Sequence, residues 1–282
     1  MVSRSSLLDV SELDMNKHIA VLMTCYNRVG TTLECLRRLF AQKVPDGYSF
    51  DVWLVDDASP DKTGEKVKAT YPQVNVIQGT GKLFWCKGMR LAWDKASEAG
   101  DYDYYLWLND DVMLRDCALS SVIDDCDKVE LSVVVGTCSS TEMYSDVSYG
   151  ATRTIPTGSP RVADKLMSGN FVLVPRNVYR TIGAICGSYH HQYGDYDYGN
   201  MLVRRGLQYY ASSRFSGVCP SQPERYDKLN GKCLVRRLRL LFDERGYDIH
   251  DAFLYKLRSK GVLAALLSAF HVVFLVIKGG SK

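Results

Sequence analysis

The sequence predicts an α/β protein: a doubly wound, mostly parallel sheet with helices on both faces, followed by a helical C-terminal extension. Short apolar runs alternate with amphipathic runs through the first half, as expected when strands alternate with helices. Three of the apolar runs end abruptly on polar or acidic residues. The chain has 282 residues, of which 46% are hydrophobic, so it can form one large globular domain with an extension.

The periodicity of the apolar residues places the individual elements. In the first half, strands are expected at 18–25, 50–55, 74–77 and 104–108, with helices at 31–40, 63–70 and 85–99. Further on, strands are expected at 131–137, 145–153 and 171–174, a helix at 175–182, and a loop over the site at 154–165. The run 104–108 is apolar throughout, which is typical of a parallel strand buried on both faces.

Composition indicates which partners and which cellular compartment to expect. A net charge of +3 is too small to indicate nucleic acid as a partner. The nine cysteines are scattered, without a Cys-x-x-Cys pair, which indicates reduced thiols in a cytosolic protein. Residues 1–17 contain no apolar core of signal-peptide length, so we expect the catalytic part in the cytoplasm.

The run 104–108 is followed by Asn109, Asp110 and Asp111. Ligands of open α/β sheets bind at the carboxyl ends of the strands. Two adjacent carboxylates at such an end repel each other unless a cation lies between them. Oxygen ligands suit Mg²⁺ or Mn²⁺, so the sequence predicts a divalent metal here. The alternative is that Asn109 and Asp110 form a turn that caps the next helix.

Two other strands bring polar residues to the same edge. The first ends with Thr24, Tyr26 and Asn27, and the second with Asp56 and Asp57. An aromatic ring can stack on a base, carboxylates can accept hydrogen bonds from base and ribose, and a metal can bridge a diphosphate. The three ends together predict a nucleotide-diphosphate site that has no phosphate-binding glycine loop. Any one acid pair alone could instead be a helix cap.

These motifs carry a family resemblance. The segments 25–28, 55–59, 108–111 and 194–197 have, in this order, the pattern of glycosyltransferase family 2. The resemblance covers about residues 17 to 215. It implies the GT-A fold and transfer of a sugar from a nucleotide-diphosphate donor with inversion at the anomeric carbon.

The resemblance also implies residue roles. Thr24, Tyr26 and either Asp56 or Asp57 would hold the base and ribose. Asp110 would face the ribose or donor sugar, and Asp111, with Asp110 beside it, would bind Mn²⁺ or Mg²⁺. Other residues that the resemblance brings to the donor site are Asn27, Arg28, Lys82, Trp85, Gly88, Asn109, Gly169 and Asn170.

The segment 190–198 supplies a candidate base. An inverting transfer needs one group that removes the proton of the acceptor hydroxyl. By the resemblance this group is Asp195; Asp197 is the alternative, and both could instead be helix caps. Gly194 replaces the family's Glu, and the segment 209–217 lacks the His that completes the metal shell in many relatives. His190 and His191 could bind a metal or form an ordinary loop pair.

The tail differs in character. The segment after Pro223 carries a net charge of about +6, and everything before it about −3. Residues 234–242 form a basic amphipathic helix, and 261–277 is an uncharged run. We expect this tail to lie on the anionic inner leaflet of a membrane. The alternatives are packing on the domain or on a second subunit in a homodimer, and crossing the bilayer.

The sequence-based hypothesis therefore has three parts. Residues 17–223 form the catalytic domain, with a nucleotide-sugar half (17–130) and an acceptor half (131–223), and residues 224–282 form the tail. The enzyme moves a sugar from a UDP- or dTDP-sugar to a hydroxyl of a lipid-linked glycan, in synthesis of a bacterial O-antigen or capsule-type polysaccharide. Alternatives are a catalytically silent sugar-binding subunit and a sugar-nucleotide pyrophosphorylase.

Overall fold

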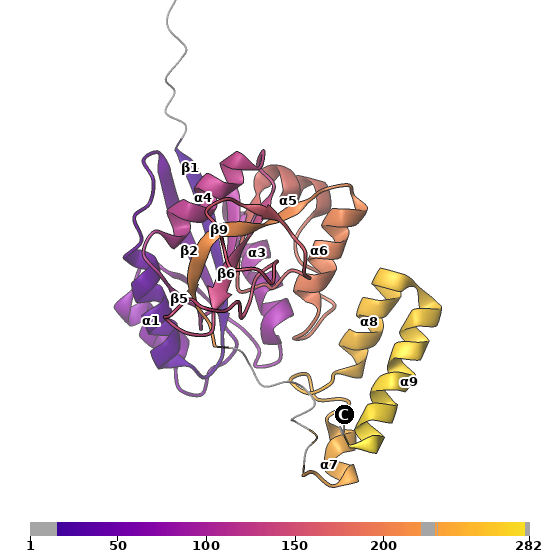
Figure 1. Cartoon of the computed structure of the whole chain (residues 1–282). Coiled ribbons are helices and arrows are strands. Elements are labelled where there is room, and N and C mark those ends of the chain that lie inside the picture. The colour runs from indigo at the N-terminus through magenta and orange to yellow at the C-terminus, as the bar shows by residue number, and fades with distance from the viewer. Residues whose placement is uncertain (1–15, 221–228, 230, 280–282) are drawn as a thin grey trace, which may run out of the picture.

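The computed structural model describes residues 16–220, 229 and 231–279. Within these residues nine strands form one sheet, in the order β3-β2-β1-β4-β8-β6-β9-β5, with β7 paired to β9 (Figure 1). The strands are β1 (Lys17–Cys25), β2 (Tyr48–Asp56), β3 (Asn75–Gln78), β4 (Tyr104–Leu108), β5 (Met113–Leu114), β6 (Val133–Ser139), β7 (Arg161–Val162), β8 (Phe171–Pro175) and β9 (Tyr209–Val218). The helices are α1 (Val29–Phe40), α2 (Thr63–Thr70), α3 (Phe84–Ala99), α4 (Ala118–Lys128), α5 (Arg176–Ile182), α6 (Gly194–Arg204), α7 (Leu234–Arg239), α8 (Ile249–Lys260) and α9 (Val262–Lys278).

The sheet is mostly parallel, as the sequence predicts. β1 pairs in parallel with β2 and β4, and β6 with β9. β8 lies between β4 and β6 and is antiparallel to both, so β4 and β6 point the same way. The carboxyl ends of β1, β2, β4, β6 and β9 therefore meet at one edge of the sheet.

Alternating side chains of the strands divide the core into two layers. On one face, Ile19, Val21 and Met23 of β1 join a cluster that includes residues of α1, α2 and α4. On the other face, Ala20 and Leu22 join a cluster that includes residues of α3, α5 and α6. This alternation is the period of a strand that is buried on both sides. The helices on both faces confirm the doubly wound architecture.

Three local expectations differ from the structure. The segment 145–153 is not a strand; it makes one isolated bridge, between Tyr149 and Cys138. Its Asp146 accepts hydrogen bonds from Ser139 and Ser140, which hold the segment as a loop against the end of β6. The expected loop 154–165 contains β7, and α4 was not among the expected helices.

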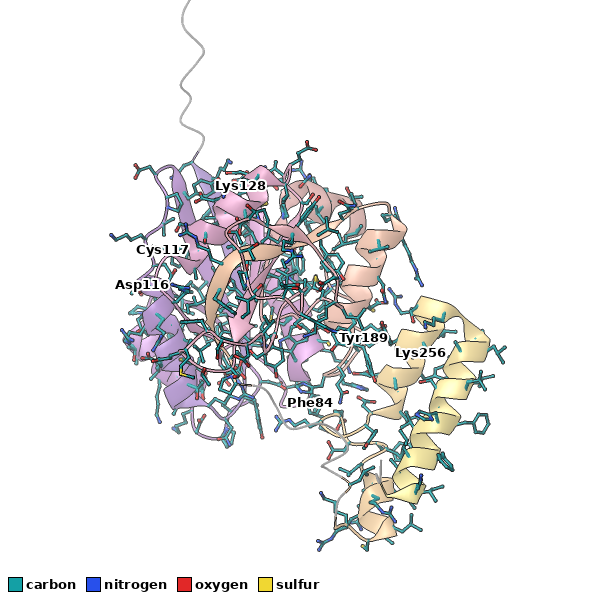
Figure 2. All side chains as sticks on the ribbon, in the orientation of Figure 1. Phe84, Asp116, Cys117, Lys128, Tyr189 and Lys256 are labelled. Carbon is teal, nitrogen blue, oxygen red and sulfur yellow. The ribbon has the colours of Figure 1, made fainter. Side chains whose placement is uncertain are left out.

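The described residues of the tail form three helices beside the domain (Figure 1). α9 packs on α8 and α7, with Val276 buried among Leu241 and Tyr247. Tyr189 of the domain and Lys256 of α8 lie on the two sides of the junction (Figure 2). None of the helices in the described residues is long and apolar enough to cross a bilayer. The expected domain boundary at residue 223 falls outside the described residues.

Candidate functional site

A cavity of about 620 Å³ opens at the carboxyl ends of the parallel strands. Eleven of the residues expected at the site line it: Thr24, Tyr26, Arg28, Asp57, Trp85, Asn109, Asp110, Asp111, Gly169, Asn170 and Asp195. The expected residues Asn27, Asp56, Lys82, Gly88 and Asp197 are not part of this lining.

The two acids at the end of β2 have different surroundings. Asp56 is buried and accepts hydrogen bonds from the backbone N–H groups of Ser59 and Gly64, which fold the turn between β2 and α2. Asp57 reaches the cavity wall and accepts N–H bonds from residues 81, 83 and 84, so it fixes the loop between β3 and α3. Of these two acids, only Asp57 is in a position to meet a ligand in the cavity.

Two glycines permit close packing at the cavity. A Cβ on Gly88 would lie 2.4 Å from Oγ1 of Thr24, so α3 can approach the end of β1 only because this residue is glycine. A Cβ on Gly169 would lie 2.5 Å from the ring of Trp85. The indole of Trp85 donates to Oδ1 of Asn109 at 2.7 Å, which holds the ring in the cavity wall.

Lys82 is exposed on the loop between β3 and α3.

Asp110 and Asp111, which follow β4 and are called here the paired acids of β4, share one cation, Arg28. Its Nη1 lies 3.1 Å from Oδ1 of Asp110 and 3.0 Å from Oδ2 of Asp111. Asp110 is buried and also accepts a hydrogen bond from the hydroxyl of Thr32. Burial raises the pKa of Asp110 to about 6, against the opposing effect of the Arg28 charge; the Asp111 charge raises it further. One guanidinium thus neutralises one of two negative charges.

Asp111 is the more open of the two acids. Its side chain is 26% exposed, compared with 6% for Asp110. Cys219 directly follows β9, and its Sγ lies 3.8 Å from Oδ1 of Asp111. Burial raises the pKa of the Cys219 thiol well above its ordinary value. The residues present fit a divalent cation, because an open carboxylate remains in a group with one uncompensated negative charge.

Asp195 lies in the first turn of α6 and lines the same cavity as Asp111. Its carboxylate accepts N–H bonds from Gly169 and Tyr196, each at 2.9 Å. Burial raises the pKa of Asp195 to about 6, although the two N–H bonds act in the opposite direction. A carboxyl with a raised pKa and a fixed orientation is suited to accept a proton near neutral pH.

Asp197, two residues further along α6, turns away from the cavity. Its side chain is 1% exposed and pairs with Arg258 of α8 at 2.9 Å. Tyr198 is likewise buried, between Trp93 and Trp107. In contrast, Tyr193 and Tyr196 line the cavity.

The tail contributes a cavity residue that the sequence analysis missed. Arg245 lines the cavity, with its guanidinium carbon 5.0 Å from the ring centre of Tyr26 and 5.9 Å from that of Phe84. No strand end or motif points to this residue, because it lies more than 200 positions after Tyr26 in the sequence. Other lining residues without an expected role are Cys25, Phe84, Tyr149, Gln192 and Cys219; His191, one of the two histidines considered as metal ligands, also lines the cavity.

Comparisons with solved structures agree with the fold. A mannosyltransferase from Pyrobaculum calidifontis, in complex with GDP-Man and Mn²⁺, superposes with a TM-score of 0.55 at 14% identity, over 94% of this chain and 76% of that one. Residues 1–349 of S. aureus TarS with UDP-GlcNAc give a TM-score of 0.57 at 12% identity, over 93% and 90%. These similarities identify the GT-A fold, and no curated protein matches the sequence.

The family model named glycosyl transferase family 2 matches residues 20–193, which is more than half of the chain. This range starts in β1, includes the ends of β2 and β4, and stops at the residue before α6. The protein therefore belongs to glycosyl transferase family 2.

Proposed function

We propose that this glycosyltransferase moves a sugar, with inversion, from a nucleoside-diphosphate donor to a hydroxyl group of a glycan acceptor. The observation that carries the proposal is that Asp111 and Asp195 line one cavity. One carboxylate can hold the donor through a metal while the other activates the acceptor. A pair of acids on opposite sides of the molecule could not share one reaction.

The donor half of the cavity comes from the ends of β1, β2 and β4. We assign the nucleobase and ribose to Thr24, Tyr26 and Asp57, because these three residues line the same cavity as Asp110 and Asp111. Arg28 and Arg245 bring positive charge to the place where an anionic diphosphate would lie. Residues 17–130 would thus form the nucleotide-sugar half and residues 131–223 the acceptor half, which contains Asp195.

Mn²⁺ or Mg²⁺ is the proposed cofactor. Asp111 would hold the ion. Arg28, which contacts both Asp110 and Asp111, would keep the two carboxylates in place. When bound, the ion would neutralise the negative charge that develops on the departing diphosphate. The mannosyltransferase with a similar fold contains Mn²⁺ together with GDP-Man, which supports a divalent cation in this chain as well.

Asp195 is the proposed base. Its N–H bonds from Gly169 and Tyr196 keep the carboxylate in place at the cavity wall. It takes the proton of the acceptor hydroxyl while that oxygen forms a bond to the anomeric carbon. The bond from this carbon to the diphosphate breaks at the same time, and the nucleoside diphosphate leaves with the electron pair. Tyr193 and Tyr196 offer flat faces against which an acceptor sugar can pack.

A lipid-linked acceptor, as in bacterial O-antigen or capsule synthesis, is favoured by the tail. Large apolar side chains on α9 are exposed: Val262, Leu263, Leu266, Leu267, Phe270, Phe274 and Ile277. α7, which packs on α9, carries exposed cations at Arg236 and Arg239. Apolar side chains beside positive charge suit the surface of an anionic membrane, and we assign the protein to the cytoplasmic side of the inner membrane.

The proposal is tested with purified protein and a panel of UDP-, dTDP- and GDP-sugars. We expect one donor to raise the thermal unfolding temperature in the presence of Mn²⁺, and to be hydrolysed slowly when no acceptor is present. Asp111→Ala should abolish both effects. A silent sugar-binding subunit would bind without hydrolysis, and a pyrophosphorylase would require pyrophosphate; either result would contradict the proposal.

A further inference from the structure

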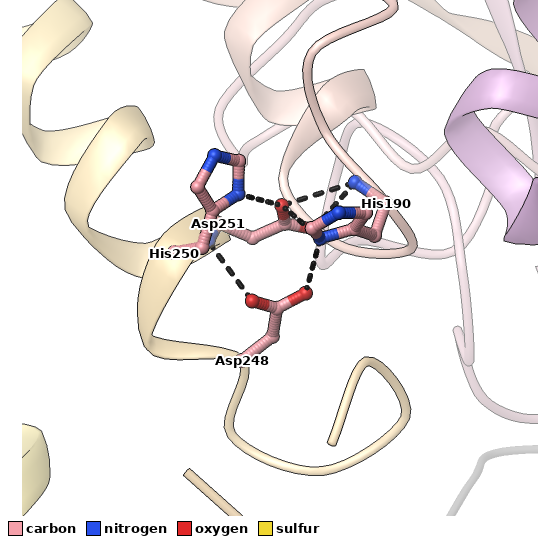
Figure 3. A group of neighbouring side chains, drawn as sticks. All are labelled: His190, Asp248, His250 and Asp251. Atoms are coloured by element: carbon pink, nitrogen blue, oxygen red, sulfur yellow. Dashed lines mark hydrogen bonds and ion pairs between the residues drawn. The ribbon is translucent and has the colours of Figure 1, made fainter. Parts of the chain in front are cut away.

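A second group of metal-ligand side chains lies at the junction of the domain and the tail. His190 belongs to the loop before α6, whereas Asp248, His250 and Asp251 belong to the start of α8 (Figure 3). One potential ligand atom from each of the four lies within 4.8 Å of all the others. The group is separate from the paired acids of β4, and none of its four members is part of the cavity lining.

Three of the distances between the ligand atoms are close to those around a small tetrahedral ion. Nδ1 of His190 lies 3.0 Å from Oδ2 of Asp248 and 3.4 Å from Oδ1 of Asp251. Nδ1 of His250 lies 3.1 Å from the same Oδ1 of Asp251. With metal–ligand bonds of about 2.0–2.1 Å, the edges of a tetrahedron are about 3.3 Å long. Small side-chain shifts would therefore bring all four atoms to a Zn²⁺ ion.

The backbone orients both carboxylates for this role. Oδ2 of Asp251 accepts N–H bonds from His190, His191 and Gln192, at 3.0 to 3.1 Å. Oδ1 of Asp248 accepts the N–H of Asp251 as the N-cap of α8. In each carboxylate the other oxygen faces an imidazole (Figure 3), and in Asp251 this oxygen, Oδ1, also accepts the N–H of His190 at 3.0 Å. Ligands held by outer hydrogen bonds are the usual arrangement around protein-bound metals.

The charges and burial agree with a divalent cation. The side chains of Asp248 and Asp251 are 4% and 0% exposed, and two buried carboxylates so close together need positive charge between them. Two neutral imidazoles and two carboxylates carry a total charge of −2, which Zn²⁺ would neutralise. His250 is 54% exposed and gives the ion a path from solvent.

We propose that His190, Asp248, His250 and Asp251 bind a structural Zn²⁺ ion that fastens the tail to the loop before α6. Both segments contribute to the catalytic cavity. The loop supplies His191, Gln192 and Tyr193, and the tail supplies Arg245, three residues before Asp248. The zinc ion would hold Arg245 over Tyr26 and keep the loop that leads into Asp195 in position. It is a second metal, distinct from the donor-site cation.

The test uses untagged, full-length protein that has been stripped with a chelator and then dialysed against Zn²⁺. We expect one tightly bound zinc ion per chain by elemental analysis, and a higher unfolding temperature than for the stripped protein. Replacing zinc by Co²⁺ should give the visible absorption of a four-coordinate site. All three readouts should persist in Asp111→Asn, which separates this site from the donor-site metal.

Two variants remove ligands and one serves as the control. His250→Ala removes an exposed ligand, and Asp248→Asn removes a charged ligand while its side-chain oxygen can still cap α8. Each should lower zinc affinity by more than the roughly 10–100-fold that loss of an outer partner costs. His271→Ala, at an exposed histidine on α9, should leave it unchanged. Absence of bound zinc from the wild type, or equal zinc affinity in His250→Ala and His271→Ala, would overturn the proposal.

Discussion

At the scale of single residues, the assignment of the catalytic base depends on a contrast between two acids that lie two residues apart on α6. Asp195 faces the cavity, whereas Asp197 is buried against Arg258. We predict that Asp195→Asn lowers kcat by about 10²–10⁴-fold, the usual contribution of a positioned base. The dissociation constant of the donor, measured by calorimetry, should change little, because Asp195 acts on the acceptor.

Asp197→Asn is the matched comparison, since it makes the same chemical change on the same helix. We expect it to reduce stability and to leave most of kcat intact. If Asp197→Asn abolished transfer while Asp195→Asn remained active, the roles of the two acids would have to be exchanged.

The raised pKa of Asp195 predicts a pH profile. Burial lifts this pKa to about 6, and the base must be ionised to accept a proton. Activity should therefore be constant above pH 6 and fall about tenfold for each pH unit below it. The profile of kcat/KM for the acceptor, recorded with the donor saturating, reports this value in the enzyme–donor complex. A profile that stays flat down to pH 5 would contradict the assignment.

The sequence predicts which acids end the strands, but not what each acid contacts. Asp56 and Asp57 are chemically identical neighbours. Only the folded turn shows that Asp56 is buried and bonded to backbone N–H groups, whereas Asp57, which also accepts backbone N–H bonds, reaches the cavity. The contact of Arg28 with Asp110 and Asp111 could not be predicted either, because Arg28 is more than 80 positions away in the sequence. Contacts between distant segments leave no local pattern.

At the scale of elements, the packing of α3 on β1 can be tested at a glycine. Gly88→Ala would place a methyl group 2.4 Å from the hydroxyl oxygen of Thr24, so the helix must move away from the strand. We predict a loss of about 1–3 kcal/mol of unfolding free energy in urea, as for other overpacked sites. Donor affinity should fall as well, because Thr24 lines the cavity.

Gly30→Ala is the control for this change. Gly30 also lies in a helix, and a methyl group there would meet nothing within 4 Å. It should be neutral or slightly stabilising, since alanine favours helices. Equal effects of the two substitutions would show that the contact with Thr24 does not limit the approach of α3.

The contact between α6 and α8 provides another test. Arg258→Ala would leave the buried Asp197 without its ion-pair partner, and we predict a loss on the order of 2 kcal/mol in urea unfolding. Arg258→Lys should recover part of this loss, because a cation returns without the guanidinium geometry. Equal stability of Arg258→Ala and the wild type would mean that α8 is held to the domain without this pair.

Elements with a clear period were predicted well, and those without one were not. β1, β2 and β4 appear where apolar runs predict them, because strands buried on both faces must be apolar. The antiparallel insertion of β8 between β4 and β6 has no such signal, since strand order depends on pairing between distant segments. The same holds for the loop 145–153, whose Tyr149, with Tyr144 just before the segment, suggested a strand.

At the scale of the whole molecule, the tail should bind membranes. We predict that the protein sediments with vesicles containing anionic phospholipid and remains in solution with neutral vesicles. Binding should weaken as salt is raised. Phe270→Ser with Phe274→Ser, both on exposed positions of α9, should reduce binding without changing hydrolysis of the donor. Equal sedimentation with neutral and anionic vesicles would contradict this role for the basic residues.

The central claim is that one cavity holds the donor beside Asp111 and the base at Asp195. The most direct measurement is a crystal structure of the protein with Mn²⁺ and the nucleoside diphosphate that stabilises it most. We predict the nucleobase beside Tyr26, the cation on Asp111, and open space between the diphosphate and Asp195 for the two sugars. A nucleotide bound outside this cavity, or a cation away from Asp111, would contradict the account.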